Sequence, residues 1–213
     1  MSAATLPGDG LYPPAAYERE DESADERFYG FPRKVVHIDD GAIAALGQCY
    51  AEVLPAVGRL LDLMSSWRSH LPASLGPSEV IGLGMNAEEM ADNPQLAKAI
   101  VHDLNREPRL PFADGEFDGA TCAVSIQYVL HPVQLFREVH RVLRPGAAFV
   151  VSFSNRCFPT KAVAVWLGSM DAQHRLLVRS YFEAAGDWSD VRDEDRSPEG
   201  NGDPLYVVWG RRQ

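Results

Sequence analysis

Short apolar runs alternate along the chain with segments in which apolar residues recur at helical spacing. The runs predict six strands: Leu60–Leu63, Glu79–Gly84, Ala99–His102, Gly119–Ile126, Ala147–Phe153 and Leu205–Trp209. Helical spacing and cap residues predict five helices, over residues 40–54, 87–91, 133–143, 161–167 and 171–184. Strands that alternate with helices indicate an α/β protein built on a doubly wound, mostly parallel sheet.

The two ends of the chain differ in character from this alternating region. Residues 1–27 are rich in Pro, Gly, Ala and acids, which predicts a flexible acidic arm. Residues 28–41 are denser in aromatic residues and predict a cover segment over the domain, which we place at residues 42–213. The acids of residues 183–203 indicate a solvated surface or loop.

Composition narrows the class of protein. The chain has 213 residues, 46% of them hydrophobic, which suits one domain with a sizeable core. Its net charge of −10 argues against nucleic acid or an anionic membrane as the main partner. The three cysteines lack metal-ligand spacing, so we expect no metal site. No signal peptide or membrane span is indicated, and a reducing cytoplasm is the expected location.

The end of the first predicted strand is the place to look for a ligand. Open α/β sheets bind ligands at the carboxyl ends of their strands, and Asp62 lies near that end. A nucleotide-binding fold usually continues into a glycine-rich turn that lets the main chain approach the ligand. Here the turn over residues 64–70 contains no glycine.

Two later segments resemble a known family. Residues 110–118, LPFADGEFD, resemble the LPF-x-D-x-x-FD signature of type 11 class I S-adenosylmethionine-dependent methyltransferases, the ubiquinone/menaquinone-biosynthesis kind. Residues 136–146, FREVHRVLRPG, resemble the E-x-x-RVL-x-PGG segment of the same family. The resemblance implies a Rossmann-like seven-stranded sheet with its last strand antiparallel. It also implies that S-adenosylmethionine lies over strands one, two and four.

The resemblance assigns cofactor roles to particular positions. Asp62 matches the acid before the family's glycine motif, whose three glycines are Met64, Ser66 and Arg68 in this chain. Gly84 stands where the family has the acid that binds the ribose, and Asn86 is a neutral substitute nearby. The resemblance further implies that Asp103 binds the adenine amino group and that the main chain of Leu104 faces the ring.

Two hypotheses follow for the glycine-free turn. In the first, a methyltransferase acting on a small molecule binds the same cofactor through the polar turn, with Ser65 and Ser66 offering hydroxyls and Trp67 covering the ring or sulfonium. The alternative is a non-catalytic protein of this fold, a binding or scaffolding module. The alternative predicts a site filled by the side chains of Met64 and Arg68.

Proton acceptors for methyl transfer can be sought among the histidines near the same edge. The candidates are His131, His70 and His37, because an imidazole accepts a proton near neutral pH. At the end of the central strand, Gln127 is the best candidate to line the cofactor site. The sequence does not indicate the methyl acceptor or an oligomeric state.

Overall fold

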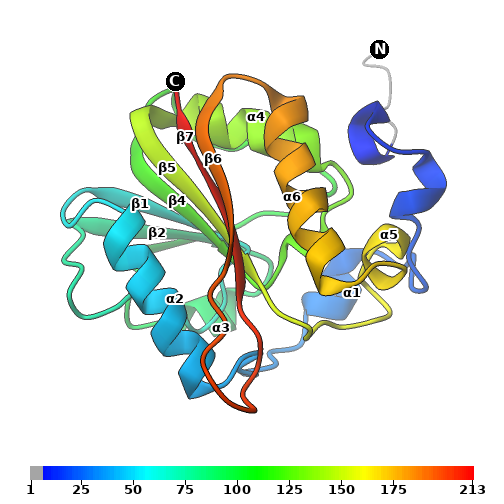
Figure 1. The fold of residues 1–213 in the computed structure, drawn as a ribbon, viewed down its shortest axis with the longest axis horizontal. Helices are drawn as coiled ribbons and strands as arrows, with labels where there is room; N and C mark the ends of the chain where they lie inside the picture. Colours follow the sequence, from blue (N-terminus) through cyan, green and yellow to red (C-terminus); the bar gives the residue numbers. More distant parts are fainter. Residues whose placement is uncertain (1–6) are drawn as a thin grey trace.

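The computed structural model describes residues 7–213, which form a seven-stranded sheet between helices (Figure 1). The strand order is β3-β2-β1-β4-β5-β7-β6. The strands are β1 Arg59–Leu63, β2 Glu79–Gly84, β3 Lys98–Val101, β4 Phe117–Ala123, β5 Leu143–Phe153, β6 Trp188–Asp195 and β7 Tyr206–Arg212. β1 to β5 pair in parallel, whereas β7 runs antiparallel to both β5 and β6. The predicted fold class is confirmed.

The apolar pattern missed one strand, β6. Residues 183–203 were expected to be surface or loop, but residues 188–195 pair antiparallel with β7 at the edge of the sheet. Most β6 residues are at least partly exposed, and acids are acceptable there because an edge strand is covered on one side only. Because β6 is only partly buried, its sequence has no continuous apolar run, and the apolar pattern did not identify it.

Helices pack on both faces of the sheet (Figure 1). The α-helices are α1 Asp25–Tyr29, α2 Asp40–Val53, α3 Ala87–Ala91, α4 Pro132–Val142, α5 Ala164–Leu167 and α6 Asp171–Ala185. Three short 3₁₀ helices are η1 Pro7–Gly10, η2 Pro14–Tyr17 and η3 Ile126–Tyr128. Phe149 and Val151 of β5 join the core under α4 and α6, while Val150 points into the core under α2. This alternation shows that β5 is buried on both faces, as expected of a central strand.

Several element boundaries differ from the sequence prediction, by one to four residues. The strand predicted to reach Ile126 ends at Ala123, because Val124 adopts a positive φ of 48° and the chain turns into η3. A branched residue rarely adopts this conformation. α4 ends at Val142, and β5 begins at Leu143 rather than at Ala147.

The segment before α2 is packed on the domain. Residues 1–6 of the predicted arm lie outside the described residues, but residues 7–27 do not form a loose arm. Tyr17 is 1% exposed, and η1 and η2 contact α4 and α5. The acids of this segment also have a structural role, because Asp25 is buried against Arg19 and Lys161. Buried ion pairs, rather than exposure to solvent, therefore explain part of the acidic composition of this segment.

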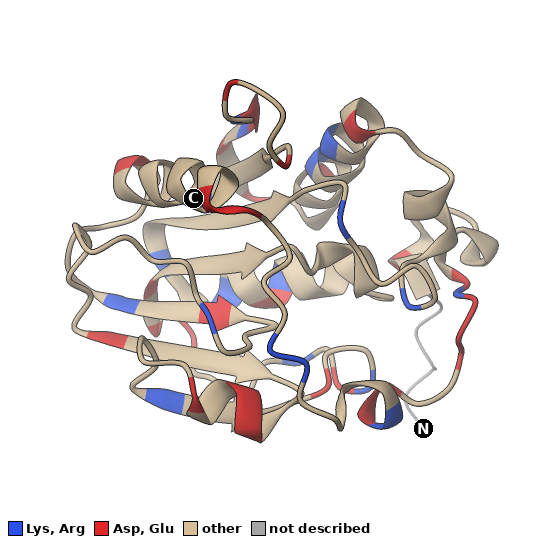
Figure 2. Ribbon diagram, turned by 90° about the horizontal axis from the view of Figure 1, so that it is seen from below, with Lys and Arg blue, Asp and Glu red and all other residues tan. Residues whose placement is uncertain are grey.

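Charged residues are interspersed along the described chain, and Lys and Arg do not gather on a single element (Figure 2). No helix among residues 7–213 is long and apolar enough to cross a membrane.

Candidate functional site

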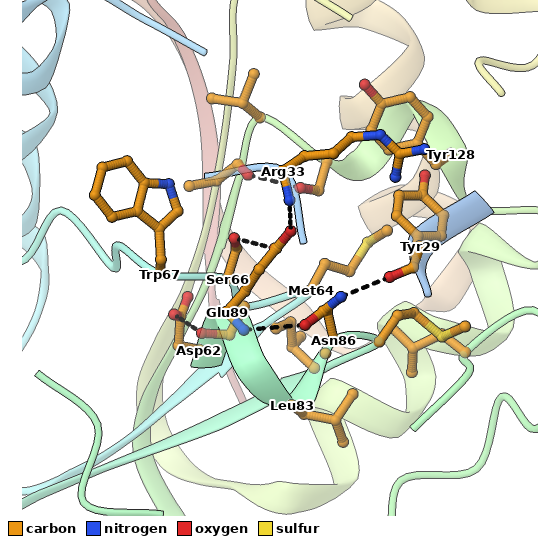
Figure 3. Close-up of a pocket in the computed structure, with 18 of the residues that line it drawn as sticks. Tyr29, Arg33, Asp62, Met64, Ser66, Trp67, Leu83, Asn86, Glu89 and Tyr128 are labelled. Carbon is orange, nitrogen blue, oxygen red and sulfur yellow. Dashed lines mark hydrogen bonds between the residues drawn. The ribbon is translucent and has the colours of Figure 1, made fainter. Parts of the chain in front are cut away.

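A cavity lies at the carboxyl ends of β1, β2 and β4, beneath the cover segment (Figure 3). Its free volume is about 140 Å³. Met64 and Arg68 line the cavity and do not fill it, contrary to the prediction of the non-catalytic hypothesis.

Most of the predicted cofactor residues meet at this cavity. Those that line it are Asp62, Ser65, Ser66, Trp67, Asn86, Asp103 and Leu104. The cover segment contributes Tyr29, Arg33, Val35 and His37. Residues far apart in the chain therefore enclose one site.

Asp62 faces the protein rather than the centre of the cavity. Its carboxylate accepts hydrogen bonds from Ser65 Oγ at 2.6 Å, Ser69 Oγ at 2.7 Å and Thr121 Oγ1 at 3.1 Å. Desolvation raises the pKa of this 3% exposed carboxyl group, and the three hydroxyls oppose that shift. Asp62 therefore anchors the turn after β1, and its hydrogen bonds explain two of the serines in that turn.

The turn adopts a glycine-like conformation without glycine. Met64, at the first glycine position of the family motif, has a φ of 54°. The next residue continues the sheet pattern, since Ser65 N–H donates to Leu83 O at 2.9 Å. This path brings the main chain of Ser65 against β2, where a Cβ on Gly84 would lie 2.1 Å from Ser65 O. The turn therefore excludes any side chain at position 84, including an acid.

Asn86 is held by two contacts of its own. Its Oδ1 accepts from Glu89 N–H at 3.0 Å and caps α3, and its Nδ2 donates to Tyr29 O at 2.9 Å. The amide thus connects the helix start to the cover segment. Asn86 is also neutral, so its hydrogen bond to a ligand hydroxyl would be weaker than that of a carboxylate, which weakens the case for Asn86 as the substitute acid.

Sequence reasoning missed Glu89, which lines the cavity from α3. The signal was present, because Asn86 followed three residues later by Glu89 has the spacing of a helix capping box. In the structure Glu89 does not complete that box. Its carboxylate instead accepts from Ser66 Oγ and from Arg33 N–H, both at 2.5 Å (Figure 3).

Trp67 connects the turn to the cover segment. Its Nε1 donates to Val35 O at 3.0 Å, and the guanidinium of Arg68 lies 4.3 Å from the centre of its ring. Arg68 therefore stacks on the indole, a favourable cation–π contact, and this position accounts for the open cavity.

At the opposite end of the cavity, Asp103 and Leu104 follow β3. Asp103 Oδ1 accepts from Asn105 N–H at 2.9 Å and from Arg106 N–H at 3.2 Å, which fixes the loop. Nearby, the hydroxyl of Tyr29 is buried and has no hydrogen-bond partner among the described residues. A buried hydroxyl without a partner is costly and marks a position where a ligand can complete the hydrogen bonding.

The three candidate histidines do not all lie at the cavity. His37 and His70 line the cavity, and burial lowers the pKa of each, to about 4 for His70. Both imidazoles are therefore neutral at neutral pH, and a pKa of about 4 makes His70 a weak proton acceptor. His131 is not among the residues that line the cavity; its Nδ1 lies 3.4 Å from Asp9 Oδ1.

Gln127 is also absent from the cavity lining. Its side chain is 1% exposed, and its Nε2 donates to Val124 O at 3.0 Å. The turn into η3 carries this residue away from the carboxyl edge, so the structure places it as a structural residue. Ser125, Tyr128 and Phe158 line the cavity in its neighbourhood.

The position of His70 gives a testable pH dependence. Its folded pKa, about 4, lies below the unfolded value of 6.5, so the unfolded chain binds more protons between these values. Stability due to His70 is therefore complete above pH 6.5 and is lost as the pH falls toward 4. Because His70 has a φ of 57°, asparagine is the substitution that its backbone tolerates best.

We expect wild type to lose about 1–2 kcal/mol more than His70→Asn between pH 7 and pH 4.5, allowing for partial exposure of the ring. Urea unfolding at a series of pH values measures this difference. Parallel stability profiles for the two proteins would contradict it.

Comparison with known proteins finds likeness to methyltransferases. A family model described as a methyltransferase domain matches residues 67–151. The mitochondrial 2-methoxy-6-polyprenyl-1,4-benzoquinol methylase of Bos taurus is 37% identical over 83 residues, which cover 36% of this chain and 25% of that protein. The match thus spans a quarter of the length of that relative.

Solved structures extend the likeness to most of the chain. The [4+2]-cyclase SpnF has a TM-score of 0.59 at 17% identity, covering 88% of this chain and 91% of the other. An S-adenosylmethionine-dependent methyltransferase from Mesorhizobium loti has a TM-score of 0.56 at 20% identity, covering 79% and 98%. At such identities the likeness shows a shared fold, which supports several chemistries.

Proposed function

We propose that the chain is a class I S-adenosylmethionine-dependent methyltransferase and that it transfers a methyl group from S-adenosylmethionine to a small molecule. The observation that carries the proposal is the cavity at the carboxyl ends of β1, β2 and β4. It brings together the adenine-side acid Asp103, the aromatic Trp67 and two neutral histidines.

The residues present fit this cofactor. Asp103 and the main chain of Leu104 suit an adenine edge, and the unpartnered hydroxyl of Tyr29 offers a further hydrogen bond. Trp67 can cover a sulfonium, a cation–π contact worth about 0.5–2 kcal/mol. When bound, the cofactor supplies an electrophilic methyl group, and the protein contributes binding and alignment.

A cavity histidine suits an acceptor that must lose a proton, and His37 is the better candidate because the pKa of His70 is lowered to about 4. His37 packs edge-on against Phe158, with ring centres 4.9 Å apart, and both residues line the cavity. A neutral imidazole here can take the proton of a hydroxyl or amine as the new bond to carbon forms. The aromatic wall favours a flat or apolar acceptor, and the net charge of −10 favours a small molecule over nucleic acid.

The proposal is tested by titrating the protein with S-adenosylhomocysteine in a calorimeter. We expect saturable binding that Asp103→Ala and Trp67→Ala each weaken about tenfold, the loss of one charge-assisted or stacked contact. Asp114→Ala is a suitable control, because that side chain is 79% exposed and absent from the cavity lining. No binding of either adenosyl compound at millimolar concentration would refute the proposal.

One observation favours the alternative, a non-catalytic binding or scaffolding module. The turn after β1 packs its main chain on Gly84, and Met64 stands where a small residue is expected. If this path closes the ribose end of the cavity, adenosyl compounds will not bind, although the protein remains folded. The same titration, with a thermal unfolding curve to verify folding, separates the two functions.

A further inference from the structure

The carboxylate of Glu89 lies at the cavity between the glycine-free turn and the cover segment. It lines the cavity from the first turn of α3, beside Asn86 and below Arg33 of the cover segment (Figure 3). Ser66 Oγ donates to Glu89 Oε2 and Arg33 N–H to Glu89 Oε1, each at 2.5 Å. The carboxylate is therefore held from two sides and cannot swing freely.

These contacts leave both carboxylate oxygens of Glu89 able to accept a further hydrogen bond. An ionised carboxylate has about four acceptor positions, two on each oxygen. Among the described residues, each oxygen of Glu89 accepts one hydrogen bond, so each keeps a further position. A carboxylate with one free acceptor position on each oxygen matches a pair of adjacent hydroxyl donors.

Among the described residues that line the cavity, the other carboxylates are those of Asp25, Asp62 and Asp103, and Asp25 is already paired with Arg19 and Lys161. Position 84 cannot carry an acid, because its Cβ would lie 2.1 Å from Ser65 O. The carboxylate of Asp62 already accepts three hydroxyls. Asn86 caps α3 and holds Tyr29 with a neutral amide, which lacks the charge of a carboxylate.

We propose that Glu89 binds the two ribose hydroxyls of the adenosyl cofactor, an inference that rests on the proposed function. S-adenosylmethionine carries a vicinal cis-diol on its ribose, which supplies the paired donors that Glu89 can accept. Ser66 and Arg33 orient the carboxylate, so the turn after β1 and the cover segment both contribute to nucleoside recognition. A hydrogen bond to a charged acceptor contributes more than a neutral one, and this makes Glu89 the residue that selects a ribose.

The experiment compares nucleosides with and without the diol. Adenosine and 2′,3′-dideoxyadenosine compete against S-adenosylhomocysteine in calorimetric titrations of wild type, Glu89→Gln and Glu88→Gln. Glu88 is the matched control, since it is the exposed neighbour on the same helix and is absent from the cavity lining. We expect wild type and Glu88→Gln to prefer adenosine by about tenfold or more, the range of a charged hydrogen bond, and Glu89→Gln to lose that preference.

The outcomes separate this inference from the proposed function. If wild type does not bind S-adenosylhomocysteine, the proposed function fails and the inference with it. If wild type binds it but Glu89→Gln keeps the preference for adenosine, only the inference is overturned. An equal loss of affinity for both nucleosides also overturns it, because Glu89 would then act only by holding the cover segment.

Discussion

Asp62→Ala is expected to lower the free energy of unfolding by about 3 kcal/mol and to abolish binding of adenosyl compounds. The substitution leaves the hydroxyls of Ser65, Ser69 and Thr121 buried without their shared acceptor. Each buried polar group left without a partner costs about 1–3 kcal/mol, partly offset because a buried carboxylate no longer has to be desolvated. The turn over residues 64–70 also loses the anchor that gives it its shape.

Urea unfolding and calorimetric titration measure the two effects of Asp62→Ala. Thr121→Val serves as the control, because it removes one of the three donors at nearly constant volume and should cost about 1 kcal/mol. A loss of stability no greater than that of Thr121→Val would contradict the anchoring role of Asp62.

Asp25→Ala is expected to destabilise the protein by about 3–5 kcal/mol, the usual cost of removing one partner of a buried ion pair. Asp25 Oδ1 lies 2.8 Å from Arg19 Nη1 and 3.1 Å from Lys161 Nζ. The side chain of Lys161 is fully buried and that of Arg19 is 5% exposed, so both cations would lose a partner away from water. The segment that leads into the cover would then be released from the domain.

Denaturant unfolding measures the loss of stability, and limited proteolysis between residues 18 and 38 measures the release. Asp114→Ala is the matched control: it also removes an aspartate paired with an arginine, Arg141, but at an exposed position. A surface pair contributes about 0–1 kcal/mol. Equal effects of Asp25→Ala and Asp114→Ala would show that burial does not strengthen the role of Asp25.

Several features of the fold were predictable because they depend on local pattern. Burial on both faces makes a central strand continuously apolar, and this identified β1, β2, β4 and β5. Gly186 ends α6 with a φ of 78°, a conformation that glycine adopts readily. The acid-rich edge strand β6 was not predictable in this way, because partial exposure leaves no apolar run.

The part of the candidate site that lies at the carboxyl ends of strands was predictable. Asp62 and Asp103 were identified from their places after predicted strands, and both line the cavity. The sequence did not indicate which way the side chains point. Asp62 faces three hydroxyls of the protein, and the turn into η3 takes Gln127 away from the cavity. Glu89 has no strand-end position and was missed.

By itself, the sequence determined the order of six of the seven strands and of five helices, the two segments that resemble methyltransferases, and the absence of glycine in the turn after β1. Periodicity and spacing along the chain are enough for these conclusions. Only the tertiary structure decided what replaces the missing glycines: a turn anchored by Asp62 and a cover segment joined to Glu89 through Arg33. Arg33 and Glu89 are 56 positions apart in the chain, so no local pattern encodes their contact.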